Sequence, residues 1–260
     1  KGVYLYNNKY NTPMVINMVR GYFILRWFGL DTVCCVVVVQ CFLAEFMGSI
    51  NLLQLVGLCC AVSLVYMLDR YRDLQLSLDI NERHILFKQQ FKSVVGSAIF
   101  LGSGAVLYWV TLVQVEQYII LSCMCVVVLH LWLLQFKTYF WIKDWVVATI
   151  FTVVMMIGRF ELIGMGLLIG VYSILNLTTH RLIETHIKII DWGIIGVLGS
   201  SLGFLVIKNI GFSPAALIWF FGLLGQLWLV KLGKEFKWWY ECGEVFYMVP
   251  FLGFLIIGNV

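Results

Sequence analysis

The chain has 260 residues, of which 62% are hydrophobic and only 12% are charged, with a formal net charge of +4. Since a soluble domain carries about 25% charged residues, this composition excludes an ordinary soluble globular domain and favours lipid as the surroundings. The basic residues do not gather on one soluble face, so the positive charge does not indicate a nucleic-acid partner.

Apolar segments long enough to cross a bilayer recur along the whole chain. A membrane-spanning helix takes roughly 20 mainly apolar residues. Nine candidate spans are found, at about 27–47, 50–68, 93–113, 117–135, 145–158, 161–178, 191–207, 213–231 and 245–260. We therefore expect an all-α fold, a polytopic transmembrane bundle of about nine helices, in which residues 27–260 form a single domain.

The segment before the first span combines charge with apolar character. Arg20 and Arg26 lie among apolar residues, a pattern typical of a helix that lies along a membrane interface. Residues 1–26 are therefore expected to form an N-terminal interfacial segment. Because the first apolar run continues into a full span, we expect no cleavable signal peptide.

The distribution of Lys and Arg between the connecting segments predicts an orientation. If the N-terminus is cytoplasmic, sixteen of the 18 basic residues fall on the inner side, and only Arg159 and Lys208 fall outside. Basic residues near span ends mark the cytoplasmic side of a membrane protein. We expect a multi-pass protein with a cytoplasmic N-terminus, in the bacterial inner membrane.

A first polar stretch closes the second span. Asp69 and Asp73 are four residues apart, so on a helix they share one face. Two such carboxylates repel each other unless a cation lies between them, and Mg²⁺ that bridges to a substrate phosphate is one solution. Arg70 and Arg72 could instead pair with them, which would make this stretch a solvated helix end.

A second polar stretch closes the sixth span. Asn176, His180 and Glu184 repeat every four residues and would form one stripe on a helix. Asn and Glu offer oxygen ligands that suit a hard cation, and Arg181 adds capacity to pair with phosphate. The alternative is an amphipathic helix end at the membrane interface.

Glycine pairs in the predicted sixth and seventh spans have the spacing of a helix-packing motif. Gly166 and Gly170 form one GxxxG pattern, and Gly199 and Gly203 form another. Small residues at this spacing let helix backbones approach closely. We expect these two helices to pack tightly within the bundle.

Nine helices, with polar motifs after the second and the sixth on the predicted cytoplasmic side, resemble the UbiA superfamily of intramembrane prenyltransferases. Asp69-Arg70 and Asp73 match the last acids of the family's first motif, while Val65-Tyr66 replaces its leading Asn-Asp. The second motif retains a single acid, Glu184. This chain looks most like the divergent, small members of the superfamily.

The resemblance implies a site and a reaction. Mg²⁺ would bind a prenyl diphosphate, and a lipophilic acceptor would attack the allylic cation formed when diphosphate leaves. The implied catalytic residues are Asp69, Asp73 and Glu184, and the implied metal ligands are Asp69, Asp73, Asn176 and Glu184. The diphosphate would be neutralised by Arg72, Arg83, Lys88 and Arg181.

Two other functions remain open from the sequence. The loss of acids from both motifs favours a non-catalytic membrane subunit or isoprenoid-binding scaffold of a larger complex on the same fold. A small transporter or channel fits less well, since few charges lie inside the spans and no internal repeat is detected.

Overall fold

The computed structural model describes residues 30–75, 91–133, 140–184, 189–211, 213–232 and 239–257. All regular secondary structure in this part is helical. The elements are α2 (Leu30–Met47), α3 (Leu52–Gln75), α5 (Phe91–Val110), α6 (Gln114–Leu133), α7 (Phe140–Met155), the short 3₁₀ helix η2 (Phe160–Leu162), α8 (Ile163–Glu184), α9 (Ile189–Ile210), α10 (Pro214–Leu232) and α11 (Trp239–Ile257). The predicted interfacial segment, residues 1–26, lies outside the described residues.

Each of the nine predicted spans coincides with one of these α-helices, which confirms an all-α bundle. Within the described residues, six helices are long and apolar enough to cross a membrane: α2, α3, α6, α8, α9 and α10. The described apolar parts of α5, α7 and α11 are shorter, at Val95–Val110, Asp144–Met155 and Gly243–Ile257. The lengths and compositions of the six longer helices are those of a multi-pass membrane protein.

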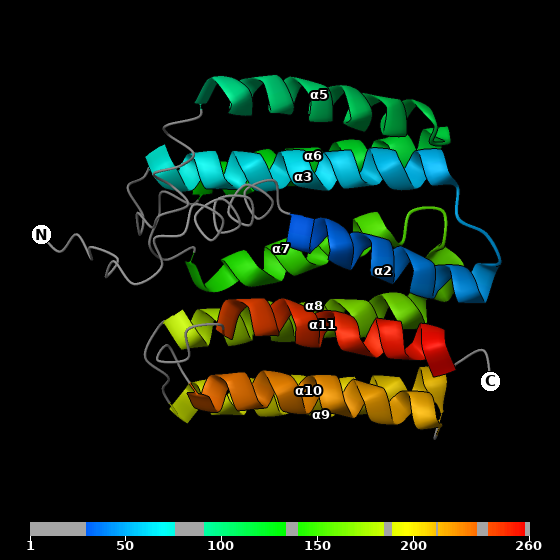
Figure 1. The fold of residues 1–260 in the computed structure, drawn as a ribbon, viewed down its shortest axis with the longest axis vertical. Helices are drawn as coiled ribbons and strands as arrows, with labels where there is room; N and C mark the ends of the chain where they lie inside the picture. The colour runs from blue at the N-terminus through cyan, green and yellow to red at the C-terminus, as the bar shows by residue number, and fades with distance from the viewer. Residues whose placement is uncertain are drawn as a thin grey trace, which may run out of the picture.

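Successive helices run side by side in opposite directions, so their ends gather at two opposite ends of the bundle (Figure 1). Helices α3, α6, α8 and α10 finish at one end, which we call the Asp69 end. Helices α2, α5, α7, α9 and α11 finish at the other, which we call the Arg159 end. Lys208, near the last turn of α9, also lies at the Arg159 end. Arg159 and Lys208, the two basic residues predicted to lie on the outer side of the membrane, therefore share one end of the bundle.

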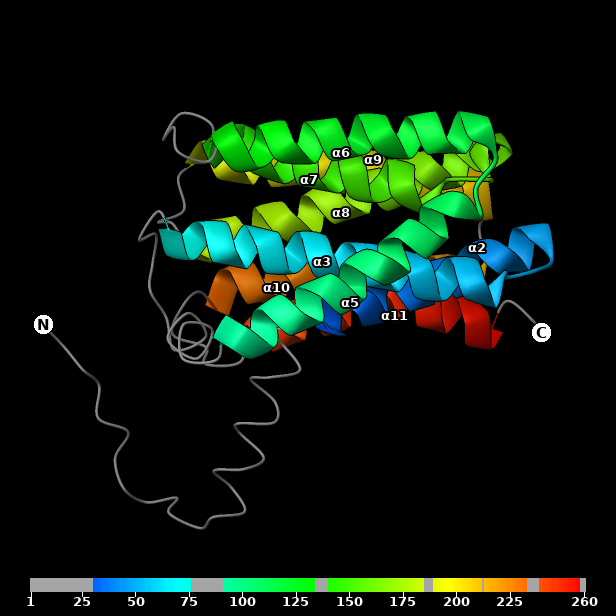
Figure 2. The same ribbon diagram turned by 90° about the horizontal axis from the view of Figure 1, so that it is seen from above.

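Helix α8 is central to the packing, with neighbours α7, α9, α10 and α11. Helices α3 and α5 form an extensive pair on the far side of α2 and α7 (Figures 1 and 2). The α3–α5 pair is close because small residues meet there: a Cβ on Gly57 would overlap Tyr108, and one on Gly104 would overlap Cys60. Close backbone approach of this kind replaces the missing hydrophobic driving force between helices in lipid.

Several helix ends follow from local sequence. The side-chain oxygen of Asn51 accepts hydrogen bonds from the backbone of α3, including one of 3.0 Å from the amide of Leu53, and so caps that helix. Helix α10 starts with Pro214 in its first turn, a position where proline's missing N–H costs nothing. Gly48 and Gly211 follow α2 and α9 with φ of 84° and 76°, as residues that end helices in the left-handed conformation do.

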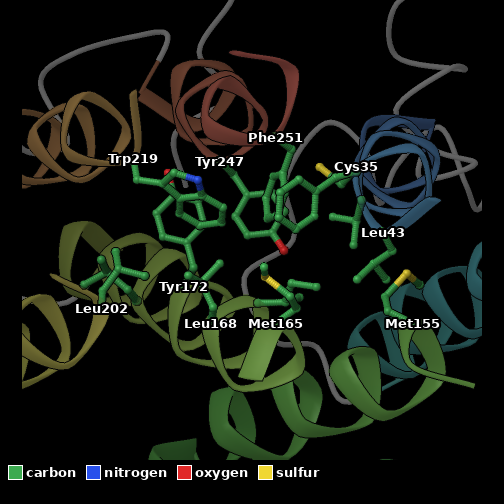
Figure 3. Close-up of a cluster of buried hydrophobic side chains, with 14 of the residues drawn as sticks. Cys35, Leu43, Met155, Met165, Leu168, Tyr172, Leu202, Trp219, Tyr247 and Phe251 are labelled. Carbon is green, nitrogen blue, oxygen red and sulfur yellow. The ribbon is translucent and has the colours of Figure 1, made fainter. Parts of the chain in front are cut away.

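Aromatic rings fill the centre between α2, α8, α10 and α11 (Figure 3). Tyr172 stacks on Tyr247 with ring centroids 5.2 Å apart. Trp219 meets Phe251 edge-on at 4.9 Å, and Phe42 meets Phe251 edge-on at 5.3 Å. Such pairs contribute about 0.5–1.5 kcal/mol each beyond the area they bury. The cluster ties the first spanning helix to three helices from the second half of the chain.

The GxxxG pattern of α8 faces α7, and the GxxxG pattern of α9 faces α10. A Cβ on Gly170 would lie 3.2 Å from Oγ1 of Thr152 in α7, and one on Gly203 would lie 3.7 Å from the Phe220 ring in α10. Helices α8 and α9 do pack against each other. Their glycines, however, make room for α7 and α10, because each helix is rotated to turn that face toward its other neighbour.

Candidate functional site

Buried polar side chains gather in the half of α8 that leads to the Asp69 end. They are Ser173, Asn176, Thr178, Thr179, His180 and Arg181. The hydroxyls of Ser173 and Thr179 donate to carbonyls four residues back at 2.8 Å, which satisfies them within the helix. The side chains of Asn176, His180 and Arg181 need partners on other helices, because an unsatisfied polar group is costly away from water.

Arg181 finds its partner in α7. Its Nη1 lies 2.9 Å from Oδ2 of Asp144, and the two side chains expose only 6% and 13% of their surface. The residue predicted to face a diphosphate is therefore held in a buried ion pair. Asp144 is not among the residues singled out from the sequence, because it stands at the edge of an apolar run with no motif around it.

Asn176 is bonded across the bundle to Gln226 of α10. Nε2 of Gln226 donates to Oδ1 of Asn176 at 2.7 Å and to the backbone carbonyl of Gly243 in α11 at 3.1 Å. Gln226 is fully buried, and its Oε1 has no hydrogen-bond partner among the described residues. Sequence reasoning missed Gln226, although a lone glutamine inside an apolar span is a signal that could have identified it.

Helix α11 adds two more contacts to this region. A Cβ on Gly243 would overlap the imidazole of His180, so the absence of a side chain lets α11 approach α8 at this point. One residue further, Oε2 of Glu244 accepts a weak hydrogen bond of 3.5 Å from the Cys35 thiol of α2. A carboxylate within a membrane helix is a functional candidate, and Glu244 was not predicted.

Asp69 lies near the end of α3 and close to α6. Nε2 of His130 is 4.0 Å from Oδ1 of Asp69, with the His130 side chain 6% exposed and the Asp69 side chain 23% exposed. At this distance the contact is longer than the one between Asp144 and Arg181. His130 is a further residue that the sequence analysis did not single out.

The two predicted motifs share one end of the bundle but occupy different parts of it. Within their described residues α3 and α8 make no extended contact, and Figure 1 shows α2 and α7 between them. The remaining predicted residues lie outside what the structure describes: the side chains of Arg72, Asp73 and Glu184, and the whole of Arg83 and Lys88.

The predicted magnesium site stays a prediction. Among the described residues, no three His, Cys, Asp or Glu side chains gather closely enough to hold a metal ion. Two of the four predicted ligands, Asp73 and Glu184, have side chains that the structure does not describe. Asp69 carries a carboxylate, the kind of oxygen ligand that Mg²⁺ prefers, and the side-chain oxygen of Asn176 accepts a hydrogen bond from Gln226.

No protein-family model matches the chain, and neither a curated protein nor a solved structure matches it. The likeness to the UbiA superfamily therefore rests on helix number and on the motif residues quoted above. Any function must be argued from the side chains themselves.

Proposed function

We propose that the chain is a UbiA-like intramembrane prenyltransferase, which uses Mg²⁺ to move an isoprenoid from a prenyl diphosphate to a lipophilic acceptor. One observation carries the proposal: the buried ion pair of Asp144 and Arg181 lies at the same end of the bundle as Asp69. Buried charge in a membrane bundle is expensive and is usually retained for a function. The position of this pair at the Asp69 end supports an ionic substrate there.

The roles follow from the chemistry of each group. Asp69 and Asp73 would hold one Mg²⁺, and Asn176 and Glu184 would hold a second, through oxygen ligands. Bound Mg²⁺ would neutralise the departing diphosphate. Arg72, Arg83, Lys88 and Arg181 would balance the remaining negative charge. The apolar bundle would shield the allylic cation from water.

Asp144 would act as a positioning residue in this scheme. Its ion pair holds the guanidinium of Arg181 in one direction, 2.9 Å from the carboxylate. A guanidinium held in this way loses little freedom when it meets a phosphate oxygen. In this scheme Arg181 would lie beside the diphosphate, and Asp144 would balance its charge when no diphosphate is bound.

The test is Mg²⁺-dependent release of diphosphate from farnesyl or geranylgeranyl diphosphate by the purified chain. Asp69→Asn should slow release by at least roughly 100-fold, the upper end of the loss on removing a group that orients a metal ligand. Glu45→Gln is the matched control, since Glu45 is an exposed carboxylate at the Arg159 end. No release with either donor, and unchanged donor binding in Asp69→Asn, would refute the proposal.

A second function is favoured by a specific observation. Asn176 and Arg181 already bond to Gln226 and Asp144, as residues with a purely structural role would. We propose as the alternative a non-catalytic subunit or isoprenoid-binding scaffold of a membrane complex. This alternative predicts saturable binding of a prenyl diphosphate without turnover, together with stable co-purification of a larger assembly. Turnover by the isolated chain would exclude it.

We further propose that the N-terminus is cytoplasmic and that the protein resides in the bacterial inner membrane. The charge asymmetry supports this orientation, since Arg159 and Lys208 share the end opposite Asp69. With nine spans, alkaline phosphatase fused after residue 260 should be active, and a fluorescent protein fused there should be dark. The reverse pattern would contradict the orientation.

A further inference from the structure

A cavity of about 220 Å³ lies at the Arg159 end, where α2, α3, α5, α6 and the turn after α7 meet. Its polar lining includes Gln40, Gln54, Tyr108, Glu116 and Arg159. Its apolar walls come from side chains of α2, α3, α7 and the turns between helices: Met47, Ile50, Leu55, Leu58, Leu112, Val154 and Ile157. The cavity is separate from the proposed transferase site, which lies at the other end, and its interpretation does not depend on prenyl transfer.

Arg159 contributes a half-buried cation to this cavity. Its Nη1 donates to Oε1 of Gln40 at 2.8 Å, and its Nη2 donates to the carbonyl of Ser49 at 3.4 Å. It forms no ion pair with any residue that the structure describes. Burial lowers the pKa of Arg159 from its ordinary value, which means that the surroundings disfavour its charge. A nearby anion would relieve that cost.

Glu116 contributes an anion to the same cavity. Its Oε2 accepts a hydrogen bond of 3.2 Å from the amide of Val113 at the start of α6. Its Oε1 lies beside Gly158, where a Cβ would be 3.1 Å away. Among the described residues Glu116 has no basic partner, and Arg159 is not close enough to serve as one. The cavity thus holds two opposite charges that do not neutralise each other.

The size and lining of the cavity limit what can occupy it. At about 30 Å³ per water molecule, the cavity holds roughly seven waters. That is below the range of about 300–1,000 Å³ usual for pockets that enclose a drug-sized ligand. The occupant is therefore a small polar group. An anion alone would be drawn to Arg159 but repelled by Glu116, and a cation alone would meet the reverse.

We propose that this cavity binds a small zwitterionic group, with its anionic part against Arg159 and its cationic part against Glu116. The side-chain amide of Gln54 supplies neutral hydrogen bonds between the two charges, and the Gln40 amide, bonded to Arg159 and to the Met155 carbonyl, holds the guanidinium in place. A phosphoethanolamine group has this chemistry. It can reach the end of a membrane bundle as a phospholipid head group or as a free solute.

The experiment measures the unfolding temperature of the full chain by tryptophan fluorescence, since a bound ligand stabilises the folded state. One arm compares nanodiscs of phosphatidylethanolamine with nanodiscs of phosphatidylglycerol. A second arm adds O-phosphoethanolamine, inorganic phosphate or ethanolamine to detergent-solubilised protein. Stabilisation by phosphatidylethanolamine alone identifies a lipid head group, and stabilisation by O-phosphoethanolamine identifies a free solute. Either result supports the proposal.

Two charge variants and two matched controls complete the test. Arg159→Gln and Glu116→Gln should each weaken zwitterion binding by about tenfold or more, the effect of losing a hydrogen bond to a charged group. Lys208→Gln and Glu45→Gln remove exposed charges at the same end and should leave binding unchanged. Glu116→Gln keeps an oxygen for the Val113 amide, so it separates ligand loss from misfolding.

Three results would overturn the proposal. Equal stabilisation by both lipids together with no effect of O-phosphoethanolamine would show that zwitterions are not recognised. Phosphate that stabilises as strongly as O-phosphoethanolamine would reduce the site to an anion site. Unchanged binding in both Arg159→Gln and Glu116→Gln would place the ligand elsewhere.

Discussion

Removing one member of the buried ion pair between Asp144 and Arg181 is expected to destabilise the bundle far more than removing both. The charged atoms are 2.9 Å apart, and the side chains are only 13% and 6% exposed. Arg181→Met alone would leave the Asp144 carboxylate buried without its cation, which costs roughly 3–5 kcal/mol. The double variant with Asp144→Leu removes both charges of this pair, and its stability should lie within about 1 kcal/mol of the original or above it.

The assay is a double-mutant cycle on the free energy of unfolding, followed by tryptophan fluorescence as denaturant is raised. The coupling between Asp144 and Arg181 should reach at least ~2 kcal/mol, within the range seen for residues in direct contact. Lys208→Met is the control for loss of a cation: Lys208 is exposed, so its removal should change stability by no more than about 0.5 kcal/mol.

A specific result would refute this reasoning. If Arg181→Met lowers the free energy of unfolding by less than about 1 kcal/mol, water reaches the pair, and the pair behaves as an exposed one. If the two single changes simply add, the side chains do not interact in the folded state. Either outcome would also remove the main support for an ionic site at the Asp69 end.

Two further predictions concern the packing of α10 and α9 and use the same unfolding assay. Gly222→Ala should cost ~1–3 kcal/mol because its Cβ would overlap the Tyr172 hydroxyl, whereas Gly196→Ala, which meets nothing within 4 Å, should be neutral or stabilising by up to ~1 kcal/mol. Equal effects at the two glycines would contradict the close contact. Gln226→Leu should cost about 1–3 kcal/mol, since Asn176 loses its buried donor. An unchanged stability would mean that water replaces the amide.

The sequence predicted the positions of the nine α-helices in the part of the chain that the structure describes, because apolar length is a local property of the chain. The predicted span at 213–231 coincides with α10, from Pro214 to Leu232. The second helix is longer than its predicted span at 50–68, since α3 continues to Gln75. Hydropathy measures the apolar part of a helix, whereas backbone hydrogen bonding continues into the polar turn that carries Asp69.

The sequence singled out Asn176 as a magnesium ligand and Arg181 as a diphosphate-binding residue, but it could not name the side chains that each of them meets in the fold. Gln226 lies 50 residues beyond Asn176, and Asp144 precedes Arg181 on another helix. Partner choice depends on how each helix is rotated about its axis and which neighbours surround it, and neither property is encoded in a local pattern.

What the sequence alone determined is therefore a chain along which apolar segments of membrane-spanning length recur, with polar groups gathered at particular helix ends. Only the tertiary structure decided which charges meet, that the glycine pairs of α8 and α9 face α7 and α10, and that Arg159 and Glu116 line one cavity. The physical reason is that hydrophobic periodicity acts within one helix, while ion pairs, close packing and cavities arise from the relative placement of several.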